Sequence, residues 1–423
     1  MATAETAGLS PDPPQDAPTA VDDGPPPTPL VEPRGGVPEV TETVAGLEAT
    51  IAALAAGTGP VAVDAERASG FRYGQRAYLV QLRREGAGTF LVDPVALPAL
   101  AGLGQAIRDV EWVLHAASQD LPCLSEVGLV PTRLFDTELA ARLLGYERVG
   151  LATLTERVLG YSLAKEHSAA DWSTRPLPPT WLSYAALDVE LLVDLRAALT
   201  TELADADKTV WAEEEFAWLI DAPAPPPRAE PWRRVSGIHR VRGRRALGEV
   251  RELWEERDRV ARQRDVAPGR VLPDATLVAI VQAQATEVSG LAAVQGLTGP
   301  RMRRTVPTWW RALERARALP ESELPQPAAG NGDGPPASVA RWADRDPAAA
   351  ARLQRARAAL AQISTDRLVP VENLLEPALV RRLAWAPPEP ADLAAVSGAL
   401  SEGRARPWQI ALTAAPLSAA FAG

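Results

Sequence analysis

The chain has 423 residues, a formal net charge of −10 and 46% hydrophobic residues, which is enough for several folded cores. Its single cysteine, Cys123, excludes an intramolecular disulfide and a cysteine-based zinc site. The sequence contains no apolar run of membrane-spanning length and no secretory signal pattern. We therefore expect a cytoplasmic protein that does not act in a membrane.

The predicted organisation is three folded blocks separated by proline-rich segments. Residues 1–38 contain ten prolines and few large apolar side chains, which predicts a disordered tail. The expected order after the tail is an α/β domain at 40–220, a linker at 222–232, a helical domain at 233–320, a second linker at 321–337 and a helical domain at 338–420. Because such linkers are natural boundaries, we expect the first block to fold without the other two.

The first block mixes helical and strand patterns. Helical spacing at 44–54 precedes a predicted meander of three strands, at 60–66, 77–84 and 89–94. A helix at 97–107, a buried strand at 112–116 and a helix at 118–128 follow, and the remainder to 219 is mostly helical. This mixture predicts an α/β fold. The later blocks show only helical patterns, at 250–265, 305–319, 347–364 and 373–385.

Acidic residues recur at particular places in the first block. Asp64 and Glu66 are two apart on a predicted strand, so both side chains point to one face and repel each other unless a cation lies between them. Tyr184 and Asp188 are four apart on one helical face. Asp120 lies near a predicted helix start. Taken alone, these residues are also compatible with a helix cap, a core tyrosine and ordinary surface charges.

The order of these motifs resembles that of the DEDD 3′–5′ exonucleases, in the subgroup with tyrosine in the third motif. VDAE (63–66), HAASQDL (115–121) and YAALD (184–188) are similar to the three motifs. FDTELAA (135–141) and KEHSAADWSTRPL (165–177) are similar to stretches of the ribonuclease D family. The resemblance implies an RNase H-like core, a mixed sheet flanked by helices, and stepwise release of nucleoside 5′-monophosphates from a free 3′ end.

The resemblance also implies roles for individual residues. Two divalent metal ions, Mg²⁺ or Mn²⁺, would be held by four carboxylates, those of Asp64, Glu66, Asp120 and Asp188. Asp64 would contact both ions. Tyr184 would orient the attacking water, because a phenol with an ordinary pKa of ~10 is a poor base at neutral pH.

Two further residues accompany these motifs. His115 is either a core histidine that fixes a backbone carbonyl or a residue behind the metal ligands that orients them, and we favour the second role. Asp136 is expected to cap a helix, with a possible supporting role behind the metal site.

Basic residues of the first block supply candidate RNA contacts. Arg67 stands where the family often has an apolar residue, and it either contacts a phosphate or points to solvent. Lys165 and Arg175 precede the third motif, and they either bind substrate phosphates or lie on the surface.

The second block is basic, with 19 arginines and 10 acidic residues between 228 and 319. Its sequence over about 238–320 resembles an HRDC domain, a small helical module of ribonuclease D and certain helicases. Arg301, Arg303 and Arg304 follow a GLTG turn and either bind RNA phosphates or cover a helix surface. The third block resembles a second HRDC-like domain, and its near-neutral charge gives no independent sign of nucleic-acid binding.

The expected function is that of a metal-dependent 3′–5′ exoribonuclease. Its RNA partner would be a tRNA precursor or another structured RNA with a free 3′ end, with no obligate protein partner. Two alternatives stay open at this point: a DNA 3′–5′ exonuclease of repair, and a catalytically inactive nucleic-acid-binding scaffold.

Overall fold

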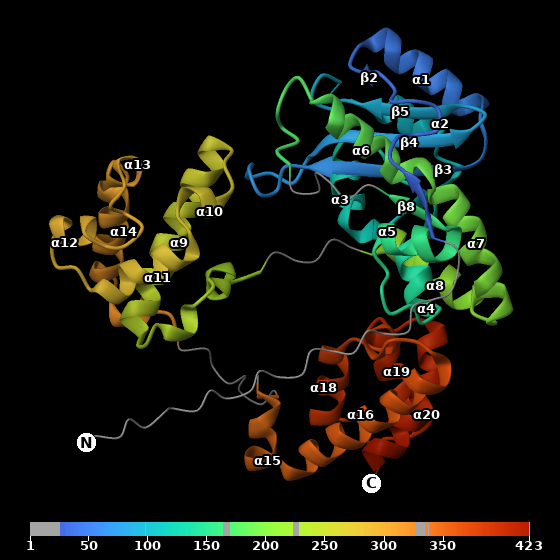
Figure 1. Ribbon diagram of the computed structural model, residues 1–423. Helices are drawn as coiled ribbons and strands as arrows, with labels where there is room; N and C mark the ends of the chain where they lie inside the picture. The colour runs from blue at the N-terminus through green and yellow to red at the C-terminus, as the bar shows by residue number, and fades with distance from the viewer. Residues whose placement is uncertain are drawn as a thin grey trace, which may run out of the picture.

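The computed structural model describes residues 26–97, 99–163, 170–222, 228–326, 335–336 and 338–422. These residues form three regions, shown in Figure 1: the α/β domain (28–221), the middle domain (228–326) and the C-terminal domain (338–422). The middle domain lies to one side of the α/β domain, whereas the C-terminal domain packs beneath it, against α8. No helix among the described residues is long and apolar enough to cross a membrane.

A mixed six-stranded sheet forms the centre of the α/β domain, in the order β2-β5-β4-β3-β6-β7. The strands are β2 (Val40–Thr41), β3 (Thr58–Arg67), β4 (Ala77–Glu85), β5 (Gly88–Val92), β6 (Glu111–Leu114) and β7 (Arg133–Asp136). The long strand β3 pairs antiparallel with β4 and parallel with β6. Val61, Ala62 and Val63 are fully buried, as expected for a central strand covered on both faces.

Helices flank this sheet, and the predicted α/β class is confirmed. They are α1 (Val44–Ala56), α2 (Ala101–Ala106), α3 (Leu121–Glu126), α4 (Thr137–Leu143), α5 (Leu151–Leu154), α6 (Pro179–Glu190), α7 (Leu192–Asp205) and α8 (Thr209–Asp221). Local signals explain their starts: Thr43 caps α1 by accepting a hydrogen bond from the Gly46 amide, and Pro179 occupies the first turn of α6. Helix α6 packs across β3, β4 and β5.

The predicted tail over 1–38 extends too far. Residues 1–25 lie outside the described residues, but β1 (Thr28–Leu30) pairs in parallel with β8 (Tyr161–Leu163). Arg34 then lies over the Tyr161 ring, 5.1 Å from its centroid. Proline disfavours helices and central strands but is compatible with an extended edge strand, so composition alone could not separate this strand from a tail.

The middle domain has a hydrophobic core of its own, which includes Leu253, Leu277 and Trp309. Its helices are α9 (Arg244–Arg264), α10 (Pro268–Val271), α11 (Asp274–Ala283), α12 (Val288–Ala292), α13 (Pro300–Arg303) and α14 (Val306–Ala318). The predicted helices at 250–265 and 305–319 are confirmed as α9 and α14, which pack against each other.

The middle domain meets the α/β domain at the loop that joins β3 to β4, residues 68–76. The Ala267 amide donates to the Phe71 carbonyl at 2.9 Å, and Arg270 donates to the Gly70 carbonyl at 2.7 Å. The Tyr73 hydroxyl donates to Asp258 at 2.9 Å. These polar bonds accompany the packing of Tyr73 against the core of the middle domain. The loop begins one residue after Arg67, so it links the middle domain to the strand that carries Asp64 and Glu66.

The C-terminal domain is different, because it shares a hydrophobic core with the α/β domain. It contains α15 (Trp342–Arg345), α16 (Pro347–Arg367), α17 (Val371–Leu374), α18 (Pro377–Trp385), α19 (Leu393–Glu402) and α20 (Pro407–Ala422). The Trp408 ring stacks on Trp211 with centroids 4.9 Å apart. Arg406 pairs with the buried Glu215 of α8 at 2.6 Å. The shared core argues against the expectation that the first block folds without this domain.

Candidate active site

Three of the predicted acids lie together where β3 ends beneath α6. Asp64 and Glu66 extend from one face of β3, as strand alternation predicts. Asp188 reaches them from α6, and one carboxylate oxygen of each residue lies within 4.8 Å of the others. This donor set consists only of hard oxygen atoms, which suits a divalent cation such as Mg²⁺ or Mn²⁺.

The charges of this cluster are unfavourable without a cation. Burial raises the pKa of Asp64 to about 6. Burial also raises the pKa of Glu66 and of Asp188 well above their ordinary values, and the Asp64 charge adds to the effect in both cases. A bound divalent ion would relieve this repulsion, so the residues present fit the metal that their chemistry implies.

Asp120 lies at the start of α3 but is not a helix cap, because its side chain makes no capping hydrogen bond. Its carboxylate lies 3.7 Å from the Arg67 guanidinium. Burial, followed by the Asp64 charge, raises the pKa of Asp120 to about 8. Asp120 thus belongs electrostatically to the acidic site, although it stands outside the cluster of three.

Asp136 holds the turn that presents Asp120. Its carboxylate caps α4 by accepting hydrogen bonds from the Glu138 and Leu139 amides, as predicted. It also accepts from the amides of Ala116 and Ala117, at 3.1 and 2.9 Å. Ala116 has a left-handed backbone with φ of 59°, a conformation that costs energy for a residue with a Cβ atom. One buried carboxylate therefore ties the second motif to the segment that follows it.

Tyr184 lies one helical turn before Asp188, and their side chains are hydrogen bonded. Burial and the neighbouring carboxylates raise the pKa of Tyr184 above its ordinary value, so the phenol keeps its proton at neutral pH. A protonated phenol beside the acids can donate a hydrogen bond and cannot serve as a base.

His115 contacts Thr137 rather than an acid. Its Nδ1 atom lies 2.9 Å from the Thr137 hydroxyl, which donates in turn to the Leu114 carbonyl at 3.2 Å. Burial lowers the pKa of His115 to about 4, which keeps the ring neutral. These contacts agree with the core-histidine alternative and give no support to the orienting role that the sequence favoured.

Arg175 is held by contacts within the protein, and its phosphate contact stays a prediction. Its guanidinium pairs with Asp93 through two nitrogens, at 2.7 and 2.9 Å. It also donates to the carbonyls of Tyr78, Trp172 and Thr174. These bonds fix the segment before α6 against β4 and β5, and they occupy the guanidinium. Lys165 lies outside the described residues.

Arg301 and Arg304 line a cavity of about 280 Å³ in the middle domain, whereas Arg303 does not line it. Arg264 and Arg270 contribute two further guanidinium groups, over a floor that includes Trp309. No acidic side chain among the described residues lines this cavity. Within the same part of the chain, the side chains of Arg264, Arg301, Arg303 and Arg304 make no hydrogen bond or ion pair.

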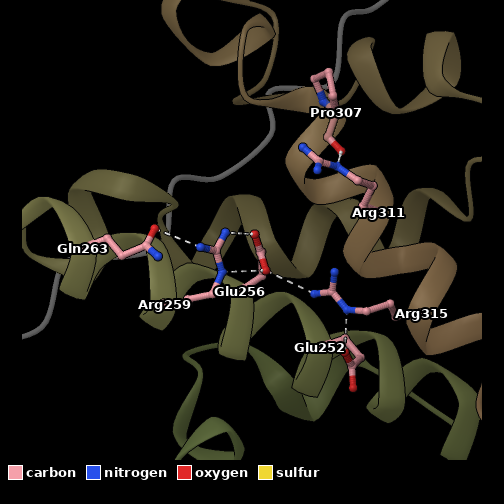
Figure 2. A network of polar contacts seen from close by, with 7 residues as sticks. All are labelled: Glu252, Glu256, Arg259, Gln263, Pro307, Arg311 and Arg315. Atoms are coloured by element: carbon pink, nitrogen blue, oxygen red, sulfur yellow. Dashed lines mark hydrogen bonds and ion pairs between the residues drawn. The ribbon is translucent and has the colours of Figure 1, made fainter.

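Other arginines of the middle domain are paired, as Figure 2 shows. Arg259 contacts Glu256, and Arg315 lies 3.2 Å from both Glu252 and Glu256. The sequence left two roles open for the arginines of this block. The paired set covers a helix surface, whereas Arg301 and Arg304 face a cavity with other arginines.

Comparisons with known proteins agree with this geometry. Residues 38–204 match the family model described as 3′-5′ exonuclease, 247–313 match the HRDC domain, and 334–421 match the 3′ to 5′ exonuclease C-terminal domain. Ribonuclease D of Jannaschia sp. (strain CCS1) is 34% identical over 282 residues, which cover 64% of this chain and 72% of that protein. This chain belongs to the ribonuclease D family. Ribonuclease D of Escherichia coli (strain K12) is 30% identical over 277 residues, 63% of this chain and 72% of that protein.

Solved structures extend the likeness over most of the chain. A protein from Bifidobacterium adolescentis is 40% identical with a TM-score of 0.85, and the match covers 94% of this chain and 100% of that one. The structure of Escherichia coli RNase D, described as an exoribonuclease involved in structured RNA processing, has a TM-score of 0.63 and 25% identity. That match covers 82% of this chain and 89% of the other.

Membership of the ribonuclease D family makes this chain a hydrolytic 3′–5′ exoribonuclease with an RNA substrate. The predicted recognition, fold class and enzyme class are confirmed. Divalent metals are implied by the exonuclease family and agree with the cluster of Asp64, Glu66 and Asp188.

Proposed function

We propose that this exoribonuclease shortens structured RNA such as tRNA precursors from the 3′ end, with two divalent ions at its acidic site. Asp64, Glu66 and Asp188 would hold one ion, and Asp120 would hold the second together with Asp64. The ions would be Mg²⁺ or Mn²⁺, and they would stabilise the charge that develops on the attacking and leaving oxygens. The observation that carries this proposal is the set of three carboxylate oxygens within 4.8 Å of one another.

Tyr184 orients the water that attacks the phosphorus atom. Its hydroxyl keeps its proton, so it acts through the direction of its hydrogen bond and not by removing a proton. The helical spacing that places this hydroxyl beside Asp188 also sets the line of attack relative to the cluster. Asp136 supports the geometry from behind, because it fixes the turn that carries Asp120.

The middle domain grips the body of the RNA at the cavity lined by Arg264, Arg270, Arg301 and Arg304. Guanidinium groups bind phosphate oxygens in a forked geometry, and an apolar floor adds contact area beside them. The bond from Arg270 to Gly70 attaches one edge of this cavity to the loop that follows β3. RNA bound there would therefore have a defined path towards the acidic site.

Digestion of labelled substrates by the full-length protein tests the proposal. RNA carrying an unpaired 3′ tail should be shortened stepwise in Mg²⁺, with nucleoside 5′-monophosphates as products, and faster than DNA of the same sequence. A 3′-phosphate should slow the reaction strongly. Asp64→Asn should abolish cleavage, whereas Asp109→Asn, an exposed acid before β6, should not change it. Faster digestion of DNA, or cutting of circular RNA, would contradict the proposal.

A further inference from the structure

Arg67 reaches into the acidic site from the end of the strand that carries Asp64 and Glu66. The β3–β4 register shifts by one residue here, because Glu66 faces Leu79 whereas Arg67 faces Ala77. Irregularities of this kind beside active sites re-aim side chains. The Arg67 guanidinium lies 3.7 Å from the Asp120 carboxylate, and only 27% of its side chain is exposed. Arg67 thus points to an acid and not to solvent, and the phosphate contact that the sequence left open stays a prediction.

The four acids consequently fall into two groups. Asp64, Glu66 and Asp188 lie close enough together to share one ion. Asp120 lies outside that set. Among the described residues, its carboxylate forms an ion pair with Arg67. An ion that binds at Asp120 must therefore compete with a guanidinium, whereas an ion at the other three carboxylates need not.

The formal charges explain what would remove that competition. Four carboxylates and one guanidinium leave three negative charges, so two divalent ions would leave one net positive charge in a partly buried site. A phosphodiester group brings the missing negative charge. It also offers the guanidinium two oxygens in place of the Asp120 carboxylate.

We propose that Arg67 is a built-in counter-cation for Asp120, so that the site binds one divalent ion without RNA and the second only together with a phosphate. When RNA binds, the guanidinium turns from Asp120 to a phosphate oxygen of the terminal nucleotide. Arg67 then holds that phosphate while Asp120 becomes free to accept the second ion. This inference rests on the proposed assignment of the four acids as metal ligands.

Counting bound Mn²⁺ by electron paramagnetic resonance tests the inference without measuring activity. In the absence of RNA, the full-length protein should bind one Mn²⁺ tightly, and adding adenosine 5′-monophosphate should bring the number to two. Arg67→Met, which removes the charge but keeps an unbranched side chain, should bind two Mn²⁺ without nucleotide. Its second site should be roughly 10–100-fold tighter, the scale on which neighbours of metal ligands change affinity. Arg67→Lys should behave like the unaltered protein.

The controls separate the possible failures. Arg76→Met removes an arginine of the β3–β4 loop that lies over Tyr78, and it should not change the metal count. If Arg67→Met does not fold, Arg67→Gln replaces it. Two equally tight Mn²⁺ ions in the unaltered protein without nucleotide would overturn the inference, as would an Arg67 variant whose second site is unchanged or weaker. If the unaltered protein bound no Mn²⁺ tightly, the proposed metal ligands would be contradicted. The Asp64→Asn variant, which lacks one of those ligands, provides the reference for such a loss.

Discussion

The two helical domains meet the α/β domain in opposite ways. The C-terminal domain continues the hydrophobic core of the α/β domain, and the Trp408 ring stacks on Trp211 inside the contact. The middle domain keeps a separate core, and among the described residues its hydrogen bonds with the α/β domain all involve the loop at 68–76, as in the bond from Tyr73 to Asp258. The C-terminal domain is therefore part of the folded core of the nuclease, whereas the middle domain is a separate unit attached to it.

Arginines show the same difference. In the C-terminal domain Arg406 pairs with the buried Glu215, and Arg352 and Arg355 donate to backbone carbonyls. In the middle domain Arg301 and Arg304 face a cavity, with no ion pair among the described residues. Net charge alone does not separate these roles, because Arg259 and Arg315 of the basic domain are also paired (Figure 2). The partner of each guanidinium decides whether it supports the fold or remains available to RNA.

Removing each domain in turn should give the largest difference. Ending the chain after residue 337 removes the C-terminal domain and exposes Trp211 and the apolar surface of the shared core, so the product should be unfolded or aggregated. Excising 228–326 should leave a folded nuclease. The ends of that segment lie together, because Arg233 donates to the Gln326 carbonyl at 2.9 Å. Thermal unfolding and sedimentation measure the difference, and equal behaviour of the two deletions would contradict it.

Single arginines should reproduce the contrast at smaller scale. Arg406→Ala leaves the Glu215 carboxylate in a buried site, and breaking a buried pair in this way costs about 3–5 kcal/mol. Arg301→Ala removes an exposed side chain and should change the free energy of unfolding by less than about 0.5 kcal/mol. Denaturant titration of both variants gives the comparison. A stable Arg406→Ala protein would mean that Glu215 finds another partner.

Chemistry at the acidic site should be independent of the middle domain. Tyr184→Phe removes one hydrogen bond that orients water, and a loss of roughly 10²–10³ in the rate of the chemical step is the expected scale. The same factor should appear in the full-length protein and in the protein that lacks 228–326, measured on a short single-stranded RNA under single-turnover conditions. Different factors in the two proteins would show that the middle domain shapes the catalytic geometry.

Metal binding should depend on pH in the same way in the full-length protein and in the protein that lacks 228–326. The pKa of Asp120 is raised to about 8 in the folded state, so a metal ion must displace a proton from it at lower pH. In the metal-free protein the folded state binds more protons than the unfolded state between pH 6.5 and 8, so its stability falls as pH rises. The Mn²⁺-induced increase in melting temperature should therefore be larger at pH 8 than at pH 6.5. A smaller increase at pH 8 would contradict the raised pKa.

Local rules predict the centre of the site but not its surroundings. Strand alternation places Asp64 and Glu66 on one face, and helical spacing places Tyr184 beside Asp188. The direction of the Arg67 side chain depends on a register shift between β3 and β4, and the sequence of β3 alone does not predict that shift. Arg175 looked available for RNA because its partner Asp93 is 82 residues away. The pairing of Glu215 with Arg406 spans 191 residues, so the contact between the α/β domain and the C-terminal domain could not be predicted either.

RNA affinity across a salt series tests most directly whether the middle domain holds RNA through its unpaired arginines. The measurement compares the inactive Asp64→Asn protein with two derivatives, one carrying Arg264→Ala, Arg301→Ala and Arg304→Ala, and one carrying Arg303→Ala as a control outside the cavity. The substrate is a tRNA-sized hairpin with an unpaired 3′ tail. Each lost phosphate contact lowers the slope of log affinity against log salt by about 0.7–0.9, so the triple variant should lose roughly 2–3 in slope. The Arg303→Ala protein should keep the parental slope. Equal slopes for the triple variant and its parent would contradict the account.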